Sequence, residues 1–509
     1  MPSHSNASDG TTKWLALLAV CFAAAAMPLT FTGTAVALPS IGRALGGSPV
    51  AIAWVTNAFM LTFGSTLMAA GALADNYGRK RIFLAGVGSF AVFSLALVFA
   101  PDILMFDLLR AAQGLAAAAA FSGGMAALAQ EFDGPARLRA FSIVGTSFGV
   151  GLSLGPVASG LMIEALGWRS IFLAVVIFAA LAFVLGWRAL KESWDPASCG
   201  LDWGGALSFT AALGLFTYGI LLAPERGWGD GRVVALLSGA ALFLILFIVI
   251  ERLVSTPMLD LSLFAYPRFV GVQLLAAAPA YGFVVLLILL PGRFIGIEGM
   301  RELTAGTLMI ALSAPLLILP VAAGLLTRWF RPATICGTGL LISAGGLLWL
   351  AQIPVGASIW MIALPMLAIG TGIGLPWGLM DGLAVSVVPK ERAGMATGIF
   401  STTRVAGEGV ALAVVSATLS MLVAGRIGGL AAPGDIVAAA QRLAAGDVTM
   451  AESAMPRTER AVLVTLYSDA FSDLLLLLTA ITLLTAVVVF FFLRTDAHDA
   501  LKGQLEGAA

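Results

Sequence analysis

Fourteen stretches of mostly apolar residues, each about 20 residues long, occupy most of this 509-residue chain. A helix of about 20 apolar residues crosses the roughly 30 Å of hydrocarbon in a bilayer. Runs such as Ala235–Ile250 lack the alternation of a barrel strand, and backbone groups cannot stay unpaired in lipid, so we predict helices. The sequence thus indicates an all-α membrane protein, with spans at 14–36, 50–71, 82–100, 104–129, 139–163, 169–189, 202–223, 233–251, 269–291, 304–326, 333–352, 358–382, 394–423 and 472–493.

The polar composition narrows the function further. Only 11% of the residues are charged, far below the roughly 25% of soluble domains, and a net charge of zero argues against a nucleic-acid partner. Both histidines, His4 and His498, lie in the polar tails, which removes histidine-based catalysis and histidine-ligated metal from the membrane interior. No Gly-x-x-x-x-Gly-Lys-Ser/Thr loop for ATP is present. We therefore expect no enzyme activity, no metal and no cofactor.

The loops predict an orientation. An even number of spans places both termini on one side, and lysine and arginine are more numerous in the short loops of that side, which indicates the cytoplasm. We expect a multi-pass protein of the bacterial cytoplasmic (inner) membrane. Its predicted divisions are a tail at 1–13, a six-helix bundle at 14–190, two inserted helices at 191–268, a six-helix bundle at 269–494 containing an outer segment at 424–471, and a tail at 495–509.

An internal repeat supports the two bundles. Ala70–Arg79 closes the second span and Ala323–Arg331 closes the tenth, each with an Ala-Gly pair followed by a short basic turn. If these segments correspond, spans 1–6 match spans 9–14. Parallel halves of this kind are typical of transporters, whose substrate site lies between the halves. Chance similarity between two short loops is the alternative interpretation.

Several motifs resemble those of the major facilitator superfamily. The loop after the second span is similar to the family's loop 2–3 signature through Gly71, Leu73, Asp75, Gly78, Arg79, Lys80 and Arg81. Arg110-Ala-Ala-Gln113-Gly114 resembles its Arg-x-x-Gln-Gly motif, and the segment from Gly151 to Gly160 resembles its exporter motif. The openings of spans 6 and 7 (Trp168–Phe172, Leu201–Gly204) and Gly394–Gly398 followed by Arg404 are similar to the fourteen-span drug:proton antiporter branch. The resemblance implies a major facilitator fold with two six-helix bundles and two inserted helices.

One departure affects the expected mechanism. The branch usually carries an acid, linked to proton coupling, in the first span before an Ala-Leu-Pro. Here Thr30 stands at that position, ahead of Ala37-Leu38-Pro39. We therefore expect any coupling acid to lie elsewhere in the chain.

Few polar groups at membrane depth could carry chemistry, because a charge there costs about 2.5–3.5 kcal/mol. Glu408 lies four residues after Arg404, on the same helical face, and could carry a proton as their contact breaks and forms. A permanent ion pair is the alternative. The same choice between a cavity residue and a structural anchor applies to Asp107, Arg110, Gln113 and Asp381.

Two further motifs are expected to act in gating and packing. The resemblance implies a cytoplasmic gate formed by Gly71, Asp75, Gly78, Arg79 and Arg81, although the basic residues also serve as a topology signal. The helix-packing motif of Gly151, Gly155, Pro156 and Gly160 allows helices to approach closely and bend. In the outer segment, Asp435–Ala445 could form a short amphipathic helix, in which we predict no chemistry.

The sequence therefore favours a secondary active exporter of amphipathic or hydrophobic small molecules, driven by a proton gradient. The expected partners are the small-molecule substrate, protons and the lipid bilayer, and the expected state is a monomer. A symporter or uncoupled facilitator of a polar metabolite on the same fold is the alternative, because the acid of the first span is missing. An intramembrane enzyme or receptor is disfavoured by the absence of membrane-embedded histidine.

Overall fold

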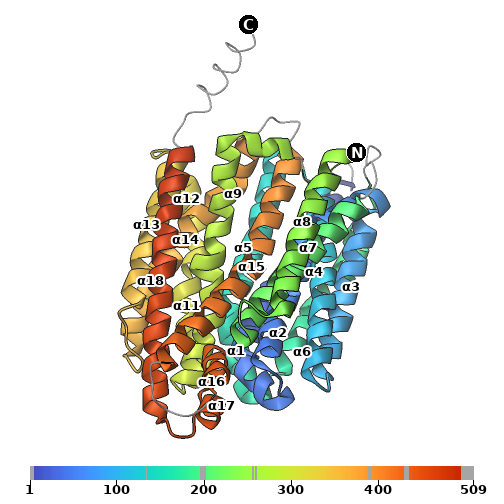
Figure 1. Cartoon of the computed structure of the whole chain (residues 1–509). Helices are drawn as coiled ribbons and strands as arrows, with labels where there is room; N and C mark the ends of the chain where they lie inside the picture. Colours follow the sequence, from blue (N-terminus) through green and yellow to red (C-terminus); the bar gives the residue numbers. More distant parts are fainter. Residues whose placement is uncertain are drawn as a thin grey trace.

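A computed structural model describes residues 5–132, 134–194, 202–254, 257, 259, 261–387, 393–428 and 435–493. Within these ranges, some side chains, including that of Asp381, lie outside the description. Fourteen described helices are long and apolar enough to cross a membrane, which confirms the predicted number. They run side by side in one bundle (Figure 1). The end where α1 begins and α18 finishes is called the termini face, and the opposite end, with α16 and α17, the cap face.

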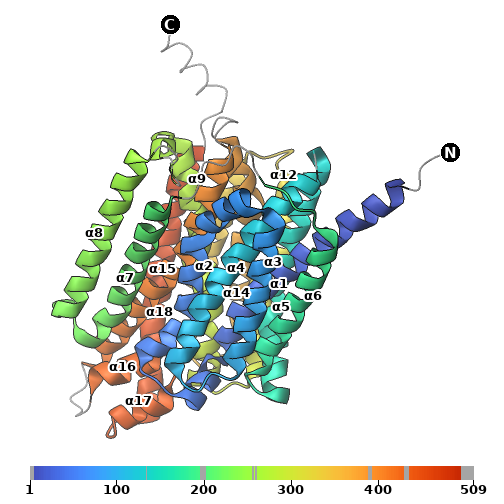
Figure 2. The same cartoon turned by 90° about the vertical axis from the view of Figure 1, so that its right-hand side faces the viewer.

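The first six spans form the N-terminal half. They are α1 (Ser5–Leu45), α2 (Pro49–Tyr77), α3 (Arg79–Val98), α4 (Ile103–Glu131), α5 (Gly134–Leu166) and α6 (Ser170–Ala189). The first helix begins at Ser5, well before the apolar stretch that starts at residue 14, so its first turns extend beyond the other helices (Figure 2). Ser48 and Asp102 cap α2 and α4 by accepting hydrogen bonds from Ala51 N and Met105 N.

The inserted pair consists of α7 (Trp203–Arg226) and α8 (Gly231–Leu253). α7 packs against α2 of the N-terminal half and α15 of the C-terminal half, and α8 packs chiefly on α7. Figure 2 shows both helices at one edge of the bundle with α8 outermost. Large apolar side chains of α8 are exposed, as lipid-facing side chains should be, among them Leu242, Ile245 and Leu253.

The C-terminal half contains the last six spans, and prolines divide two of them. The ninth span comprises α9 (Pro267–Pro279), the π-helix η2 (Ala280–Val284), α10 (Val285–Pro291) and the π-helix η3 (Gly292–Ile297), after the 3-10 helix η1 (Leu261–Ala265). The tenth comprises α11 (Glu302–Ser313) and α12 (Pro315–Leu326). The breaks after α9, α10 and α11 fall beside Pro279, Pro291 and Pro315, and proline has no backbone N–H to continue the helical ladder. The remaining spans are α13 (Pro332–Leu350), α14 (Ile359–Ser386), α15 (Ala393–Ile427) and α18 (Arg460–Leu493).

The two halves repeat one another, as the loop similarity suggested. In the N-terminal half α1 packs on α5 and α6, and α3 on α4 and α6. The C-terminal half makes the corresponding pairs, with α9 on α15 and α18, and α13 on α14 and α18. The halves meet through α2 with α15 and through α5 with α11. These two interfaces are exchanged by the same correspondence, which is the arrangement expected of parallel repeats about an axis along the bundle.

A small cap lies on the C-terminal half at the cap face (Figure 1). It consists of α16 (Ile436–Ala444), whose Asp435 accepts a hydrogen bond from Ala438 N, and α17 (Val448–Ala454). The amphipathic helix predicted at 435–445 is therefore present. Its backbone contacts the ninth span so closely that a Cβ on Gly296 would collide with the carbonyl oxygen of Gly446.

Candidate functional site

Arg110 is the most completely buried charged residue of the described chain, with 0% of its surface exposed. Its Nε donates to Val55 O at 2.9 Å, and its Nη1 donates to Gln113 Oε1 at 2.5 Å and to Thr30 Oγ1 at 3.3 Å. The guanidinium lies 4.5 Å from the ring centroid of Phe59. Arg110 therefore joins α1, α2 and α4 inside the N-terminal half. In this conformation its contacts are those of a structural anchor between helices.

Gln113 extends this network to a fourth helix. Its Nε2 donates to Ser94 Oγ of α3 at 2.7 Å and to Thr30 Oγ1 at 3.4 Å, and its side chain is also 0% exposed. Thr30 thus accepts from both Arg110 and Gln113, although it replaces the acid that the family resemblance leads one to expect. The buried guanidinium is surrounded by neutral acceptors.

No carboxylate among the described residues lies within ion-pair distance of Arg110. Asp107 is one turn away on α4, but its Oδ1 is buried without a hydrogen-bond partner. One guanidinium nitrogen, Nη2, is likewise buried and unpartnered. A buried donor without a partner costs about 1–3 kcal/mol. A hydrogen-bond acceptor or a negatively charged group placed beside Nη2 would therefore be stabilising.

Arg404 and Glu408 lie one turn apart on α15, where this helix packs against α2. Glu408 is buried, with 9% of its surface exposed. The two do not form an ion pair within 4 Å. The Arg404 guanidinium instead lies 5.5 Å from the Phe400 ring and 5.9 Å from the Trp377 ring, and it has further interactions. Asp381 belongs to α14, and its side chain lies outside the described residues.

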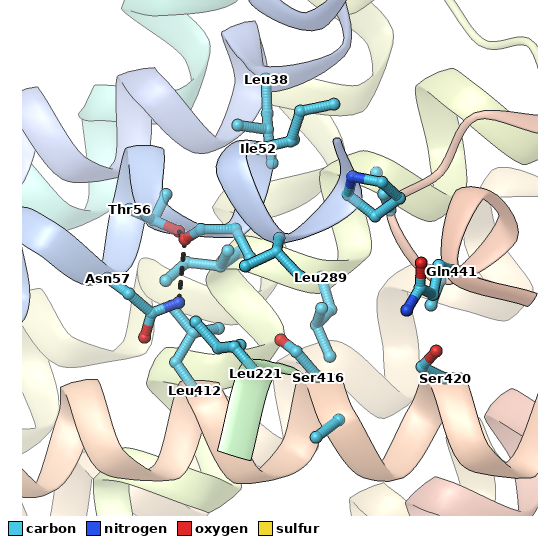
Figure 3. Close-up of a pocket in the computed structure, with 18 of the residues that line it drawn as sticks. Leu38, Ile52, Thr56, Asn57, Leu221, Leu289, Leu412, Ser416, Ser420 and Gln441 are labelled. Atoms are coloured by element: carbon cyan, nitrogen blue, oxygen red, sulfur yellow. Dashed lines mark hydrogen bonds between the residues drawn. The ribbon is translucent and has the colours of Figure 1, made fainter. Parts of the chain in front are cut away.

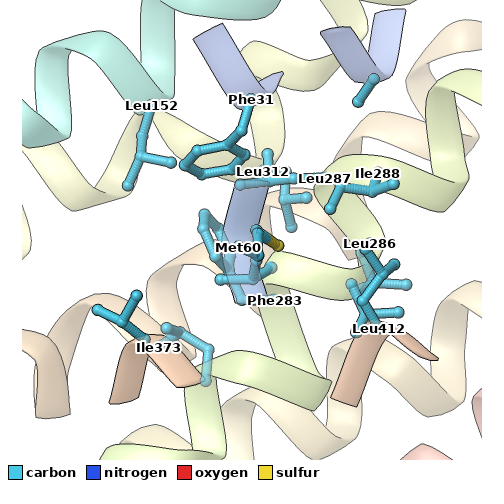
Figure 4. Packing of buried hydrophobic residues seen from close by; sticks show 14 of the residues in the cluster. Phe31, Met60, Leu152, Phe283, Leu286, Leu287, Ile288, Leu312, Ile373 and Leu412 are labelled. Carbon is cyan, nitrogen blue, oxygen red and sulfur yellow. The ribbon is translucent and has the colours of Figure 1, made fainter. Parts of the chain in front are cut away.

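A cluster of apolar side chains, which we call the plug, lies between Glu408 and the cap face. We define it as Phe31, Met60 and Leu152 of the N-terminal half with Phe283, Leu312 and Leu412 of the C-terminal half; all are at most 5% exposed. These six side chains come from six different elements and converge between the halves (Figure 4). Leu412 lies one helical turn beyond Glu408 on α15, so the carboxylate and the plug are adjacent on one helix.

On the cap-face side of the plug lies a cavity of about 90 Å³. Its walls come from α1, α2, α7, α10, α15 and α16, so both halves, the inserted pair and the cap contribute. Figure 3 shows polar side chains entering it from three of these helices: Thr56 and Asn57 from α2, Ser416 and Ser420 from α15, and Gln441 from α16. We call these five residues the polar ring.

Two ion pairs join the halves at the cap face. Arg43 at the end of α1 pairs with Glu302 of α11 at 3.8 Å, and Arg301 pairs with Glu164 at the end of α5. At the termini face, the described ion pairs stay within the N-terminal half. Among the residues that the structure describes, the interhalf ion pairs therefore lie at the cap face.

The predicted gate motif lies at the termini face. Asp75 pairs with Arg79 at 2.7 Å on the same half, and Glu192 holds the following loop by accepting from Lys80 N and pairing with Arg81 at 3.5 Å. Gly78 has φ +109°, and a Cβ there would lie 2.6 Å from a Glu192 oxygen, so the turn requires glycine. Gly71 has open space around its Cα.

The helix-packing motif of α5 lies between two helices. Gly151 and Gly155 let α5 approach α1, where a Cβ would meet Ala25 O at 2.5 Å and Thr32 Oγ1 respectively. Gly160 contacts α11 of the other half, where a Cβ would lie 2.7 Å from Glu302 O. Pro156, one turn before Gly160, packs its carbonyl against Gly306. The motif thus joins the α1 contact to the interface between the halves.

Sequence reasoning missed the polar ring. Asn57 sits in an apolar run and gave no signal, and Gln441 belongs to a segment in which no chemistry was predicted. The only available hint was the amphipathic pattern of 435–445, which indicated that one face of the segment would be buried.

Comparisons with known proteins agree with this architecture. Residues 20–412 match the family model described as Major Facilitator Superfamily. The chain is 30% identical over 388 residues to the multidrug resistance protein Stp of Mycobacterium tuberculosis, covering 76% of this chain and 72% of that protein. It is 33% identical over 423 residues to a puromycin resistance protein of Streptomyces alboniger, covering 81% and 84%.

Among solved structures, a bacterial homologue of the human lysosomal transporter Spinster, described as inward-facing and unoccupied, aligns with a TM-score of 0.62. At 16% identity over 95% of this chain and 97% of the other, this match shows the shared fold alone. The fourteen spans, the two repeated halves and the family model lead to one conclusion. The chain is a multi-pass membrane protein that belongs to the Major Facilitator Superfamily.

Proposed function

We propose that this protein is a secondary active exporter of amphipathic or hydrophobic small molecules, driven by inward proton movement across a bacterial cytoplasmic membrane. It works as a monomer by alternating access, with both termini and the termini face in the cytoplasm. The names of the relatives, which include multidrug and puromycin resistance proteins, support export of such molecules.

The placement of Glu408 carries the coupling part of the proposal. It is a buried carboxylate at the boundary between the halves, it is adjacent to the plug, and none of the described ion pairs joins it to Arg404. A carboxylate held by a permanent ion pair could not exchange protons readily, whereas this one can gain or lose a proton when α15 moves against α2.

The ion pairs support a conformational cycle. In the described conformation, Arg43–Glu302 and Arg301–Glu164 hold the cap face together, while Asp75 pairs within its own half at the termini face. We assign this arrangement to the state open toward the cytoplasm. In the opposite state, the cap-face pairs separate and the Asp75–Arg79 region closes the cytoplasmic side.

The test is substrate-dependent pH change in everted vesicles with puromycin and a panel of other antibiotics. Glu408→Gln should abolish substrate-induced proton movement while the protein still inserts into the membrane. Glu459→Gln, which changes an exposed carboxylate at the cap face, is the matched control and should behave like the wild type. Normal proton flux in the Glu408 variant would eliminate this residue as carrier.

The second candidate function is uncoupled facilitation of a polar metabolite. One observation favours it, namely that neutral acceptors surround Arg110 in place of an acid. The same assay separates the two functions, because an uncoupled facilitator moves its substrate without moving protons.

A further inference from the structure

The cavity at the cap face contains hydrogen-bonding groups that the protein does not satisfy. Asn57 is 1% exposed; its Nδ2 donates to Ala53 O at 2.9 Å, but its Oδ1 is buried without a partner. The side chains of Ser416, Ser420 and Gln441 form no hydrogen bond with another residue of the described chain. Buried polar groups are normally hydrogen-bonded, so the buried Asn57 Oδ1, together with three further unpartnered polar side chains around the same cavity, indicates that something else binds there.

The polar ring is oriented for a shared ligand. Figure 3 shows Ser420 and Gln441 facing one another across the cavity, from α15 and α16, while Ser416 extends into it one turn along α15. Ser420 and Gln441 are 6% and 8% exposed, and both line the cavity. Together they offer hydroxyl and carboxamide groups that both donate and accept hydrogen bonds.

The lining excludes ions. No charged residue is among the side chains that line the cavity, and its other walls are apolar, with Ile52, Leu221, Ile288 and Leu412 contributing. An ion placed there would lose its hydration without gaining a counter-charge, which costs far more than burial of a hydrogen-bonded neutral group. The site therefore suits an uncharged molecule with an apolar body and neutral polar groups.

The size of the cavity relates it to a conformational step. A drug-sized ligand occupies a pocket of about 300–1,000 Å³, whereas this cavity measures about 90 Å³. A whole molecule enters only after the cap face opens. The position of the cavity along α15 agrees with such a step. Residues at intervals of four follow one another from Glu408 beside the plug, through Leu412 in the plug, to Ser416 and Ser420 in the cavity.

We propose that the polar ring is an exit-side binding site for uncharged amphipathic molecules, occupied after the substrate passes the plug. This proposal rests on the proposed export function and specifies the class of substrate that uses the site.

The experiment measures ligand protection of an introduced cysteine. In a background without the native Cys21, Cys199 and Cys336, Ser420→Cys and Thr418→Cys are labelled from the cap-face side with a membrane-impermeant maleimide. Thr418 is the matched control, because it lies two residues away on α15 and its hydroxyl donates to Val414 O of its own helix. The probes are chloramphenicol and other uncharged antibiotics, cationic ethidium, and anionic fluorescein, and export of each is measured in parallel.

The proposal predicts that uncharged probes slow labelling at position 420 several-fold, leave position 418 unchanged, and lose this effect when Gln441→Leu is added. Gln352→Leu, an exposed glutamine near the same face, should preserve it. Equal protection by ethidium, protection at both positions, or export of uncharged probes without protection would overturn the proposal and leave the export function intact. Protection without export would support the site while refuting the export function. If the uncharged probes neither protect position 420 nor are exported, both the site and the export function are refuted.

Discussion

Replacing Thr30 with aspartate should stabilise the protein, although it introduces a charge at membrane depth. The Thr30 hydroxyl lies 3.3 Å from Nη1 of Arg110, whose Nη2 is buried and unpartnered. A carboxylate at position 30 would approach both nitrogens. Two unit charges about 4 Å apart attract by about 4 kcal/mol at an effective dielectric constant of 20, and pairing the unmet donor contributes about 1–3 kcal/mol more.

The opposing cost is removal of the new carboxylate from water, which is several kcal/mol. Desolvation of Arg110 is present in the wild type as well, so it cancels from the difference. We expect Thr30→Asp to be about 1–2 kcal/mol more stable than the wild type, and Thr30→Val to be about 1–3 kcal/mol less stable because it removes an acceptor from two buried donors.

Unfolding of the purified protein in detergent, followed by heat and by denaturant, measures these differences. Thr34→Asp is the matched control, since Thr34 is also 0% exposed on α1 and its hydroxyl donates to the backbone oxygen of Thr30. This variant should be destabilised by several kcal/mol, because its carboxylate is buried without the arginine. If Thr30→Asp lowers stability as much as Thr34→Asp does, the view of Arg110 as a buried cation that lacks its anion is wrong.

Three further predictions concern contacts between the moving parts. Gly64→Val should abolish transport while membrane insertion persists, because a Cβ at this position would lie 2.5 Å from a backbone nitrogen of α15 and overpacking costs about 1–3 kcal/mol; vesicle transport checks this. Arg43→Glu or Glu302→Arg alone should increase the rate of maleimide labelling of Ser420→Cys by at most about fivefold, as expected for an exposed ion pair. The combined swap should restore the original rate. Gly446→Ala should speed hydrogen exchange in 436–454, because Gly446 has φ +80° and its Cβ would press on the ninth span.

The spans could be predicted because their signal is local. A run of about 20 apolar residues identifies itself without reference to the rest of the chain, and all fourteen were found. The ends were less predictable: α18 begins at Arg460, well before the apolar stretch that starts at residue 472, because its first turns bury Leu463, Tyr467 and Phe471 against the rest of the protein.

The polar contacts were less accessible to sequence reasoning, because they join distant segments. Arg110 and Thr30 are 80 residues apart in sequence, and only the fold brings the guanidinium to the position where an acid was expected. The spacing of Arg404 and Glu408 placed both on one face of α15 but could not reveal that the arginine lies over Phe400 and Trp377. The polar ring requires α16 to fold back against α15 and α7, which no local pattern specifies.

The order of residues along α15 gives the halves a way to share one movement. Glu408, the plug residue Leu412 and the ring residue Ser416 occupy successive turns of a helix that contacts α2 so closely at Gly64 that no Cβ fits between them. A tilt of α15 about this contact must displace the carboxylate and Leu412 together, because a helix is stiff over two turns. Opening the plug is therefore mechanically tied to a change in the surroundings of Glu408. A transporter that couples protons to substrate needs this link, since protonation can drive only a movement that changes the free energy of the proton-binding group.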